Sequence, residues 1–214
     1  MSFEYSEKMT EVLASRFCHD LINPISAIAN GVELIEDGDT EMVLQVANLL
    51  TQSSKRAMAL LQFFRFAFGS AGAEKPTGSK DLLNYAQELY TENKIVFDWQ
   101  IDLDKVLAPG NGKIILLAVM ICAEALPRGG TIIVKFSTET KENVLFVQSQ
   151  NNVIKLNPEI HDVIYNNSSN LTPRTLPLLL LNYCINKFLG KANYEIDEKA
   201  ILLKIILPSI SNDS

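Results

Sequence analysis

The sequence predicts an α+β protein: an N-terminal antiparallel helical hairpin that forms a four-helix bundle with a second copy, followed by a C-terminal α/β sandwich. Apolar residues recur every three or four positions over residues 7–37 and again over about 41–68, which is the spacing of amphipathic helices. Small and turn-forming residues follow in GSAGAEKPTGSK at 69–80, and shorter helix and strand patterns alternate after it. We therefore expect a hairpin at 1–70, a linker at 71–80 and a sandwich at 81–214.

The hairpin prediction follows from two long helices joined by a very short connection. Gly38 and Asp39 end the first helix, and so short a loop makes the two helices antiparallel neighbours. Pro24 lies inside the first helical pattern, where it removes a backbone hydrogen bond and should bend the helix. A hairpin alone cannot surround both of its apolar stripes. Its partner is either the rest of the chain or a second copy, and we expect a symmetric homodimer, which is the commonest solution.

The C-terminal region carries its patterns in an order typical of a layered α/β domain. Asn157 followed by Pro158 indicates a helix start, because a proline in the first turn loses no intrahelical bond. The strands at 131–138 and 143–149 are close enough to form a hairpin, so we expect a mostly antiparallel sheet. Helices are expected at about 80–93, 113–126, from 157–158 and at 175–189, and strands at 95–101, 131–138, 143–149, 193–196 and 200–208.

Composition narrows the functional classes. The chain has 214 residues, 47% hydrophobic and 21% charged, which is typical of a globular protein. Its net charge of −6 disfavours nucleic-acid binding, which needs clustered basic residues. The longest apolar run, 114–123, is far shorter than the about 20 residues of a transmembrane helix, and the polar N-terminus is unlike a signal peptide. Three cysteines without a CxxC pair suggest a reducing cytoplasm. We expect a cytoplasmic protein without nucleic-acid or membrane partners.

The two histidines of the chain differ in their setting. His161 lies in a short polar segment and is expected to be an ordinary surface residue. No second His or Cys lies three or four positions after His19, which argues against a metal site. On geometry alone, His19 is either a solvated residue or a functional one. It belongs to the polar face of the first helix, at steps of three and four, with Ser15, Arg16, Asn23, Ser26, Asn30 and Glu33.

The residues that follow His19 favour the functional alternative. HDLINP, at 19–24, resembles the H-box of two-component histidine kinases, in which an acidic residue follows the histidine and Asn-Pro or Thr-Pro stands four positions on. Together with FFRFAFG and AEALPRGGTI, the string CHDLINPISAIANGVELIED resembles the alphaproteobacterial histidine phosphotransferase family ChpT over nearly the whole chain. The resemblance implies a dimeric phosphotransfer hairpin and a degenerate kinase-type ATP-binding domain. Such proteins pass phosphoryl groups from the receiver domain of a hybrid kinase to response regulators.

The residues themselves argue against ATP binding. Kinases of this class hold Mg-ATP through an Asn-containing helix, but residues 118–125 contain no Asn. Such kinases also carry a glycine-rich lid, whose amides approach phosphate closely; here no glycine lies between the strand at 143–149 and the helix at 175–189. Glu124 alone is weak evidence for a metal. Residues 172–175 could bind an anion at a helix start, although a simple cap is favoured.

We expect His19 to attack the aspartyl phosphate of a receiver, because a neutral imidazole is a competent nucleophile. The receiver would supply Mg²⁺, and no cofactor is expected on this chain. Arg16, one turn before His19, and Arg65, at the end of the second helix, would balance the phosphate charge or else be plain surface charges. The resemblance implies an acid–base or orienting role for Asp20, with an exposed salt bridge as the alternative.

The rest of the polar face is assigned to receiver docking. Asn23 lies one turn after His19 and would contact the imidazole or the incoming receiver. Ile22, Ser26, Ala27 and Asn30 extend the face, and the small residues among them would admit a receiver helix or merely reduce crowding beside the proline. Two other functions stay open: an ATP-dependent kinase without a sensor, and a non-enzymatic dimeric regulator that binds receivers.

Overall fold

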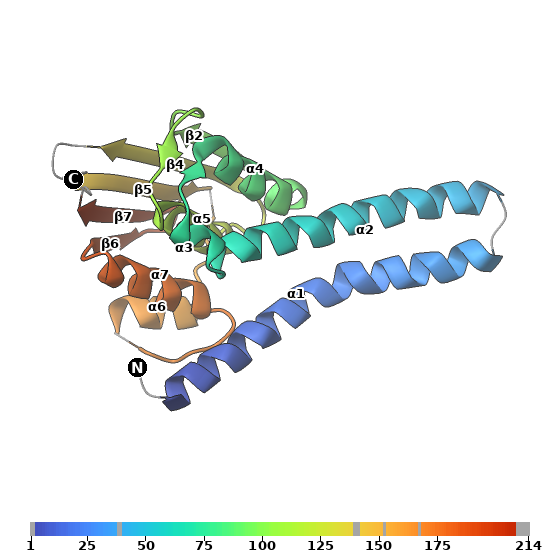
Figure 1. Cartoon of the computed structure of the whole chain (residues 1–214), viewed down its shortest axis with the longest axis horizontal. Helices are drawn as coiled ribbons and strands as arrows, with labels where there is room; N and C mark the ends of the chain where they lie inside the picture. Colours follow the sequence, from blue (N-terminus) through green and yellow to red (C-terminus); the bar gives the residue numbers. More distant parts are fainter. Residues whose placement is uncertain (1–2, 38–39, 139–141, 152, 167, 209–214) are drawn as a thin grey trace.

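Two long helices form the N-terminal hairpin of the computed structural model, which describes residues 3–37, 40–138, 142–151, 153–166 and 168–208. They are α1 (Phe3–Asp37) and α2 (Thr40–Ala67), within a few residues of the predicted bounds. The expected stop at Gly38 and Asp39 lies outside the described residues. Figure 1 shows the far half of the hairpin projecting from the rest of the chain as an arm.

The two helices of the hairpin pack closely against each other in the arm, and the N-terminal end of α1 turns away from α2 (Figure 1). Gly31 faces α2, where a Cβ would come within 2.7 Å of a methyl group of Leu50. Pro24 lies inside α1 and is buried, and α1 changes direction along its length (Figure 1), as expected for a proline within a helix. The N-terminal half of α1 then passes beside α7 (Leu176–Lys187). At the base, Phe17 stacks on Phe64 with ring centroids 4.7 Å apart.

The residues predicted as a linker, 71–80, are folded and packed against the C-terminal domain. These residues form α3 (Ala71–Glu74), β1 (Thr77–Gly78) and the start of α4, and β1 pairs antiparallel with β3 (Val106–Leu107). Gly72, Thr77 and Ser79 are buried, and Trp99 Nε1 donates to Ser79 Oγ over 2.9 Å. A Cβ at Gly72 would lie 2.5 Å from a backbone oxygen. The small residues therefore allow close packing here, which composition alone cannot distinguish from flexibility.

The C-terminal part is a sheet covered on one face by helices, and the predicted two-part α+β fold is confirmed (Figure 1). The strand order is β2-β4-β5-β7-β6; β2 is parallel to β4 and the other pairs are antiparallel. The strands are β2 (Ile95–Gln100), β4 (Gly130–Thr138), β5 (Glu142–Gln150), β6 (Lys191–Ile196) and β7 (Ala200–Pro208). The helices are α4 (Ser79–Tyr90), the short η1 (Thr91–Asn93), α5 (Asn111–Glu124), α6 (Pro158–Tyr165) and α7 (Leu176–Lys187).

Helix α5 is the centre of the molecule. It packs against the sheet, against α7, and against α2 and α4, so every residue from 112 to 123 is buried. The one charged residue in this stretch is Lys113, whose ammonium group donates to the carbonyl oxygens of Phe68 and Gly69, each over 3.1 Å. Lys113 thereby satisfies carbonyls at the end of α2, a place that favours a cation. The base of the hairpin is thus attached rigidly to α5.

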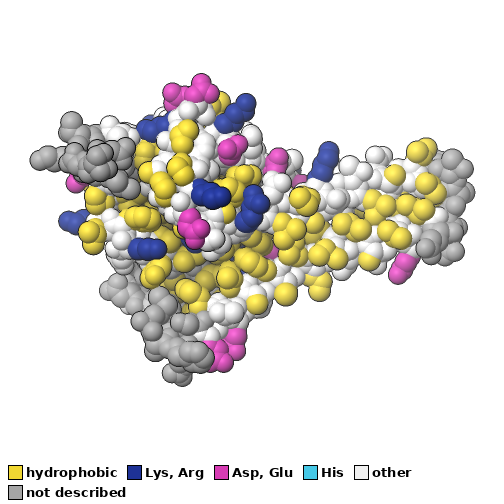
Figure 2. Space-filling model, viewed as in Figure 1, with side chains coloured by type: hydrophobic (Ala, Val, Ile, Leu, Met, Phe, Trp, Pro, Cys, Tyr) yellow, Lys and Arg dark blue, Asp and Glu magenta, His cyan; other side chains and the backbone are white. Residues whose placement is uncertain are grey.

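The hairpin leaves many apolar side chains exposed. Figure 2 shows apolar atoms along one side of the projecting hairpin. The exposed set includes Leu44 at 66% and Ile22 at 59% of full exposure. Its other members on the two helices are Ile25, Val32, Leu34, Met42, Leu49, Met58 and Leu61. Among the described residues, no helix combines the length and the hydropathy needed to cross a membrane.

Candidate functional site

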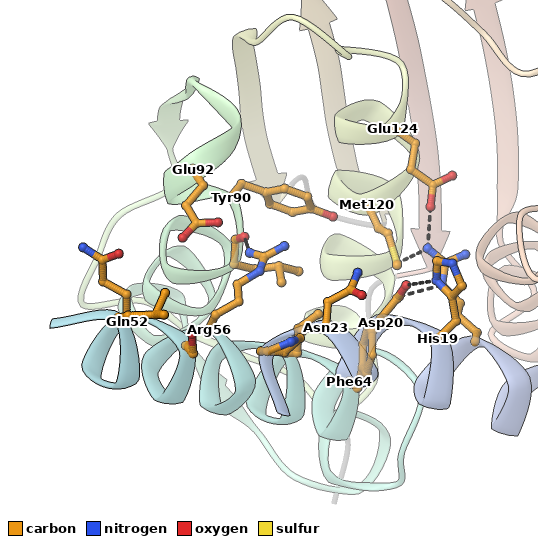
Figure 3. Close-up of a pocket in the computed structure, with 16 residues that line it drawn as sticks. His19, Asp20, Asn23, Gln52, Arg56, Phe64, Tyr90, Glu92, Met120 and Glu124 are labelled. Carbon is orange, nitrogen blue, oxygen red and sulfur yellow. Dashed lines mark hydrogen bonds and ion pairs between the residues drawn. The ribbon is translucent and has the colours of Figure 1, made fainter. Parts of the chain in front are cut away.

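His19 stands at the edge of a cleft between the hairpin and the C-terminal domain. Its side chain is 83% exposed, and its Nδ1 lies 3.0 Å from Oδ1 of Asp20. The cleft has a volume of about 510 Å³ and is enclosed by α1, α2, the end of α4 with η1, and α5. Figure 3 shows Met120 and Glu124 reaching from α5 toward the His19–Asp20 pair. A second hollow, of about 530 Å³, lies on the side of the segments before α6 and α7.

Arg16 connects three segments that are distant in the sequence. Its Nη2 donates to Oε1 of Glu124 over 2.5 Å, and its Nη1 donates to the carbonyl oxygen of Pro173. Its Nε lies 3.7 Å from Oδ2 of Asp20, one turn along α1. The Arg16 side chain is only 11% exposed. The alternative of a plain surface charge therefore does not hold for Arg16, because the C-terminal domain covers this side of α1, while its part in balancing a phosphate charge stays a prediction.

Arg16 lies beside two carboxylates, Glu124 and Asp20, and its positive charge affects the pKa of Glu124. Burial raises the pKa of the Glu124 carboxyl above its usual range, and the Arg16 guanidinium offsets part of that rise. Asp20 adds a second negative charge near Arg16. One cation thus serves two carboxylates, which come from different domains. The exposed-salt-bridge alternative for Asp20 is incomplete, since its other oxygen faces His19.

The predicted docking residues lie beside His19 as the helical wheel indicates. Asn23 lines the same cleft as His19 and Asp20 and is exposed. Ile22, Ser26 and Asn30 are exposed, and Ala27 is half-buried. These positions form a surface on α1 that is open to a partner.

Arg65 is not among the residues that line the two hollows at His19, so the structure does not bring it to the predicted place beside the phosphoacceptor. Its guanidinium lies 5.4 Å from the ring centroid of Phe66, and it borders a hollow with Leu13 and Phe17. Those residues belong to the apolar side of α1, whereas His19 lies on the side of the C-terminal domain. Arg56, nine residues earlier on α2, lines the cleft instead and donates to the carbonyl oxygen of Leu89.

The segment at 172–175 is a cap rather than an open anion site. The hydroxyl of Thr172 donates to Oε2 of Glu159 over 2.6 Å, and the hydroxyl of Thr175 donates to the carbonyl oxygen of Asn170, also over 2.6 Å. These hydroxyls are satisfied within the protein, and the nearby carboxylate would repel an anion. His161 is exposed and its ring contacts Tyr165 with centroids 4.7 Å apart, as expected for a surface residue.

Sequence reasoning missed the residues that the C-terminal domain brings to the cleft. Glu124 was weighed only as a metal ligand, and the described residues contain no group of three side chains that could hold a metal ion. Tyr90 and Arg56 carried no signal at all, because only the packing of α2 against α4 brings them to His19. Arg16 and Glu124 are separated by 108 positions, beyond the reach of any local pattern.

Comparison with known proteins adds independent findings. The family model for the histidine phosphotransferase C-terminal domain matches residues 79–200, more than half of the chain. The protein phosphotransferase ChpT of Brucella abortus (strain 2308) is 35% identical over 152 residues, which make up 69% of this chain and 70% of that protein. A solved bacterial phosphotransferase is similar with a TM-score of 0.80 and 25% identity, covering 96% of this chain and 97% of the other. The histidine kinase AdeS of Acinetobacter baumannii is more distant, with a TM-score of 0.46 and 12% identity over 90% of this chain and 98% of the other.

Proposed function

Because the chain belongs to the histidine phosphotransferase family, we propose that His19 is its phosphoacceptor in a phosphorelay. The phosphoryl group comes from the receiver aspartate of a hybrid histidine kinase and passes on to the receivers of response regulators. The observation that carries this proposal is the setting of His19: an exposed imidazole whose Nδ1 is held by an adjacent carboxylate. The ring of the other histidine, His161, packs against Tyr165 instead.

The chemistry needs little from this chain beyond a positioned nucleophile. With the proton on Nδ1 and Asp20 Oδ1 accepting it, the lone pair of Nε2 points outward. Nε2 attacks phosphorus in line, an N–P bond forms, and the P–O bond to the receiver aspartate breaks, leaving a carboxylate. The imidazole ring gains positive charge, which the Asp20 carboxylate stabilises while it holds the Nδ1 proton. Mg²⁺ belongs to the receiver in this proposal.

Receiver docking is assigned to the exposed side of α1. Ile22, Asn23, Ser26, Ala27 and Asn30 lie beside and beyond His19 and offer a mostly small or apolar surface. A stable interface buries about 800 Å² on each partner, so any receiver that reaches His19 covers this face. The same interface serves donor and acceptor receivers, because both bring a phosphorylated or phosphorylatable aspartate to the same nitrogen.

We infer that the chain does not use ATP. The helix that would hold the nucleotide is α5, and its residues 112–123 are buried on every side. Together with the missing Asn and lid glycines, this burial supports a transferase without kinase activity. Calorimetry should give no measurable heat of Mg-ATP binding, and a micromolar affinity would revive the kinase alternative.

We also propose that the protein is a cytoplasmic homodimer. The exposed apolar side chains of the arm, including Leu44, Met58 and Leu61, would be covered by the arm of a second copy in a four-helix bundle. An acidic chain without nearby cysteine pairs, with its described cysteines free, suits a reducing compartment. Net negative charge makes nucleic acid an unsuitable partner.

The decisive experiment is phosphate transfer from a phosphorylated receiver domain. The wild-type chain should acquire acid-labile phosphate, His19→Ala should acquire none, and His161→Ala should behave as the wild type. His161 is the matched control, since these are the two histidines of the chain. Labelling of His19→Ala at the wild-type level contradicts the assignment. A wild-type chain that binds receivers yet never takes phosphate identifies a non-enzymatic regulator instead.

A further inference from the structure

A continuous chain of contacts runs from α5 of the C-terminal domain to the imidazole of His19. Glu124 Oε1 accepts from Arg16 Nη2 over 2.5 Å. Arg16 Nε lies 3.7 Å from Asp20 Oδ2, and Asp20 Oδ1 lies 3.0 Å from His19 Nδ1. The contact between Asp20 and His19 lies within the hairpin. The contact between Glu124 and Arg16 joins the hairpin to the C-terminal domain.

We propose that Glu124 is a positioning residue for phosphotransfer, acting on His19 through Arg16 and Asp20. The inference rests on the proposed function in that it takes His19 as the phosphoacceptor. It assigns to the C-terminal domain a direct part in preparing the nucleophile, in addition to any part in holding the receiver.

The geometry of Arg16 gives the reason. Glu124 and the Pro173 carbonyl oxygen hold the two terminal nitrogens of the guanidinium, so its Nε stays 3.7 Å from Asp20. At that distance Nε makes no hydrogen bond, and it is a buried donor without a partner among the described residues. Arg16 Nε therefore takes up neither oxygen of Asp20 in a hydrogen bond, and Oδ1 faces His19 Nδ1. Arg16 thus places its positive charge beside both Asp20 and Glu124, but of these two carboxylates it forms a hydrogen bond only with Glu124.

Loss of the Glu124 carboxylate would release one end of the guanidinium. An arginine and a carboxylate one turn apart on a helix can form a two-bond pair, and Arg16 would then turn toward Asp20. That pair competes with His19 for the same oxygens. A histidine freed from Asp20 shifts toward the tautomer with the proton on Nε2, which ordinary histidine side chains favour in water. In that tautomer Nε2 has no lone pair for phosphorus.

The experiment uses the full chain and compares Glu124→Ala, Glu124→Gln and Arg16→Ala with the double variant Glu124→Ala/Arg16→Ala. Phosphoryl transfer to His19 is measured with phosphoramidate, a small donor that needs no docking surface, and with a phosphorylated receiver domain at saturation. The tautomer of His19 is read from its ¹⁵N imidazole shifts at roughly pH 8, where an ordinary histidine is neutral. His161 is the internal reference in the same spectrum.

Glu124→Ala should lower the rate with both donors by roughly 10- to 100-fold, the loss typical when a residue that orients a reactive group is removed. Its His19 should also shift toward the Nε2–H tautomer. Glu124→Gln should recover most of the rate, because its amide oxygen still accepts from Arg16. In the Arg16→Ala background, Glu124→Ala should cause no further loss, since residues acting through one another are not additive. Glu92→Gln, which removes another carboxylate lining the cleft, should leave the tautomer unchanged.

Three results would overturn the proposal: an unchanged phosphoramidate rate in Glu124→Ala, an unchanged His19 tautomer, or an equal loss in the presence and absence of Arg16. Circular dichroism and thermal unfolding identify any variant that merely misfolds, and Glu124→Gln keeps the test usable in that case. Failure of the proposed function looks different. There the wild type itself takes no phosphate on His19, whatever the tautomer.

Discussion

Replacing Arg16 by methionine should make the stability of the protein depend on pH through Glu124. Methionine keeps the length and apolar stem of the arginine but leaves the Glu124 carboxylate and the Pro173 carbonyl oxygen without their donors. Removing one partner of a buried ion pair costs about 3–5 kcal/mol of unfolding free energy. The Glu124 side chain is 28% exposed, so solvent screening reduces the loss, and we expect about 2–3 kcal/mol at roughly pH 8.

The direction of the pH dependence follows from the pKa of Glu124. Burial already raises this pKa, and Arg16 lowers it, so the methionine variant should have a pKa higher still. A carboxyl with a raised pKa in the folded state contributes most stability below its unfolded pKa of about 4.3, and that contribution is lost as the pH rises through the folded pKa. The variant should therefore lose unfolding free energy as the pH rises above the unfolded pKa of about 4.3, and over a wider pH range than the wild type.

Urea denaturation at several pH values measures this difference. The matched control is Arg16→Met/Glu124→Gln, which carries no titrating group at position 124 and should lose the additional pH dependence. Glu124→Gln should destabilise the wild type but stabilise Arg16→Met at roughly pH 8, because it removes an unpaired buried charge. Equal pH slopes in Arg16→Met and the wild type would refute the reasoning, as would a Glu124→Gln effect of the same sign and size in both backgrounds.

Three further predictions concern docking, the attachment of the hairpin, and the arm. Ser26→Arg should weaken receiver binding by roughly a hundredfold while the fold is kept, because an interface would bury an unpaired guanidinium; an unchanged transfer rate below saturation would remove Ser26 from the footprint. Lys113→Met should lower the unfolding free energy by about 2–4 kcal/mol, since two buried carbonyl oxygens lose charged donors; urea denaturation with no loss contradicts this. Leu44→Glu should halve the mass seen by light scattering, and a wild type that is already monomeric at micromolar concentration would refute the dimer.

The helices and strands could be predicted because their signals are local. The strand patterns around Ile132 and Leu203 alternate with period two, and both strands occur where expected, with one face buried. Asn157 caps α6 by accepting from the Glu159 amide over 2.9 Å, as the Asn-Pro pair indicates. The structure of residues 71–80 could not be predicted, because it depends on contacts with residues outside the segment. Gly72 is required by a backbone oxygen 2.5 Å from where its Cβ would be, and such a contact leaves no periodic trace in the sequence.

The candidate site could be predicted only along its own helix. His19 and Asn23 are one turn apart on α1, so a helical wheel places them together. Asp20 could be assigned only through the string HDLINP, because adjacent helical residues do not share a face. The position of Arg65 failed because the wheel of one helix does not say which of its faces meets the next helix at a given height. Glu124 could not be assigned for a further reason: its role depends on the docking of α5 against the hairpin, which involves the whole core.

This dependence suggests a structural reason for attaching the C-terminal domain to the hairpin. Every residue of α5 from 112 to 123 is buried, and Lys113 at one end fastens it to the last carbonyls of α2. At the other end, Glu124 meets Arg16. A helix held at both ends and packed on all sides has little freedom to shift, so the carboxylate that it presents to α1 is held at a defined position relative to the hairpin. If Glu124 positions Arg16 as proposed, a fixed carboxylate keeps Asp20 and His19 in the same arrangement from one receiver to the next.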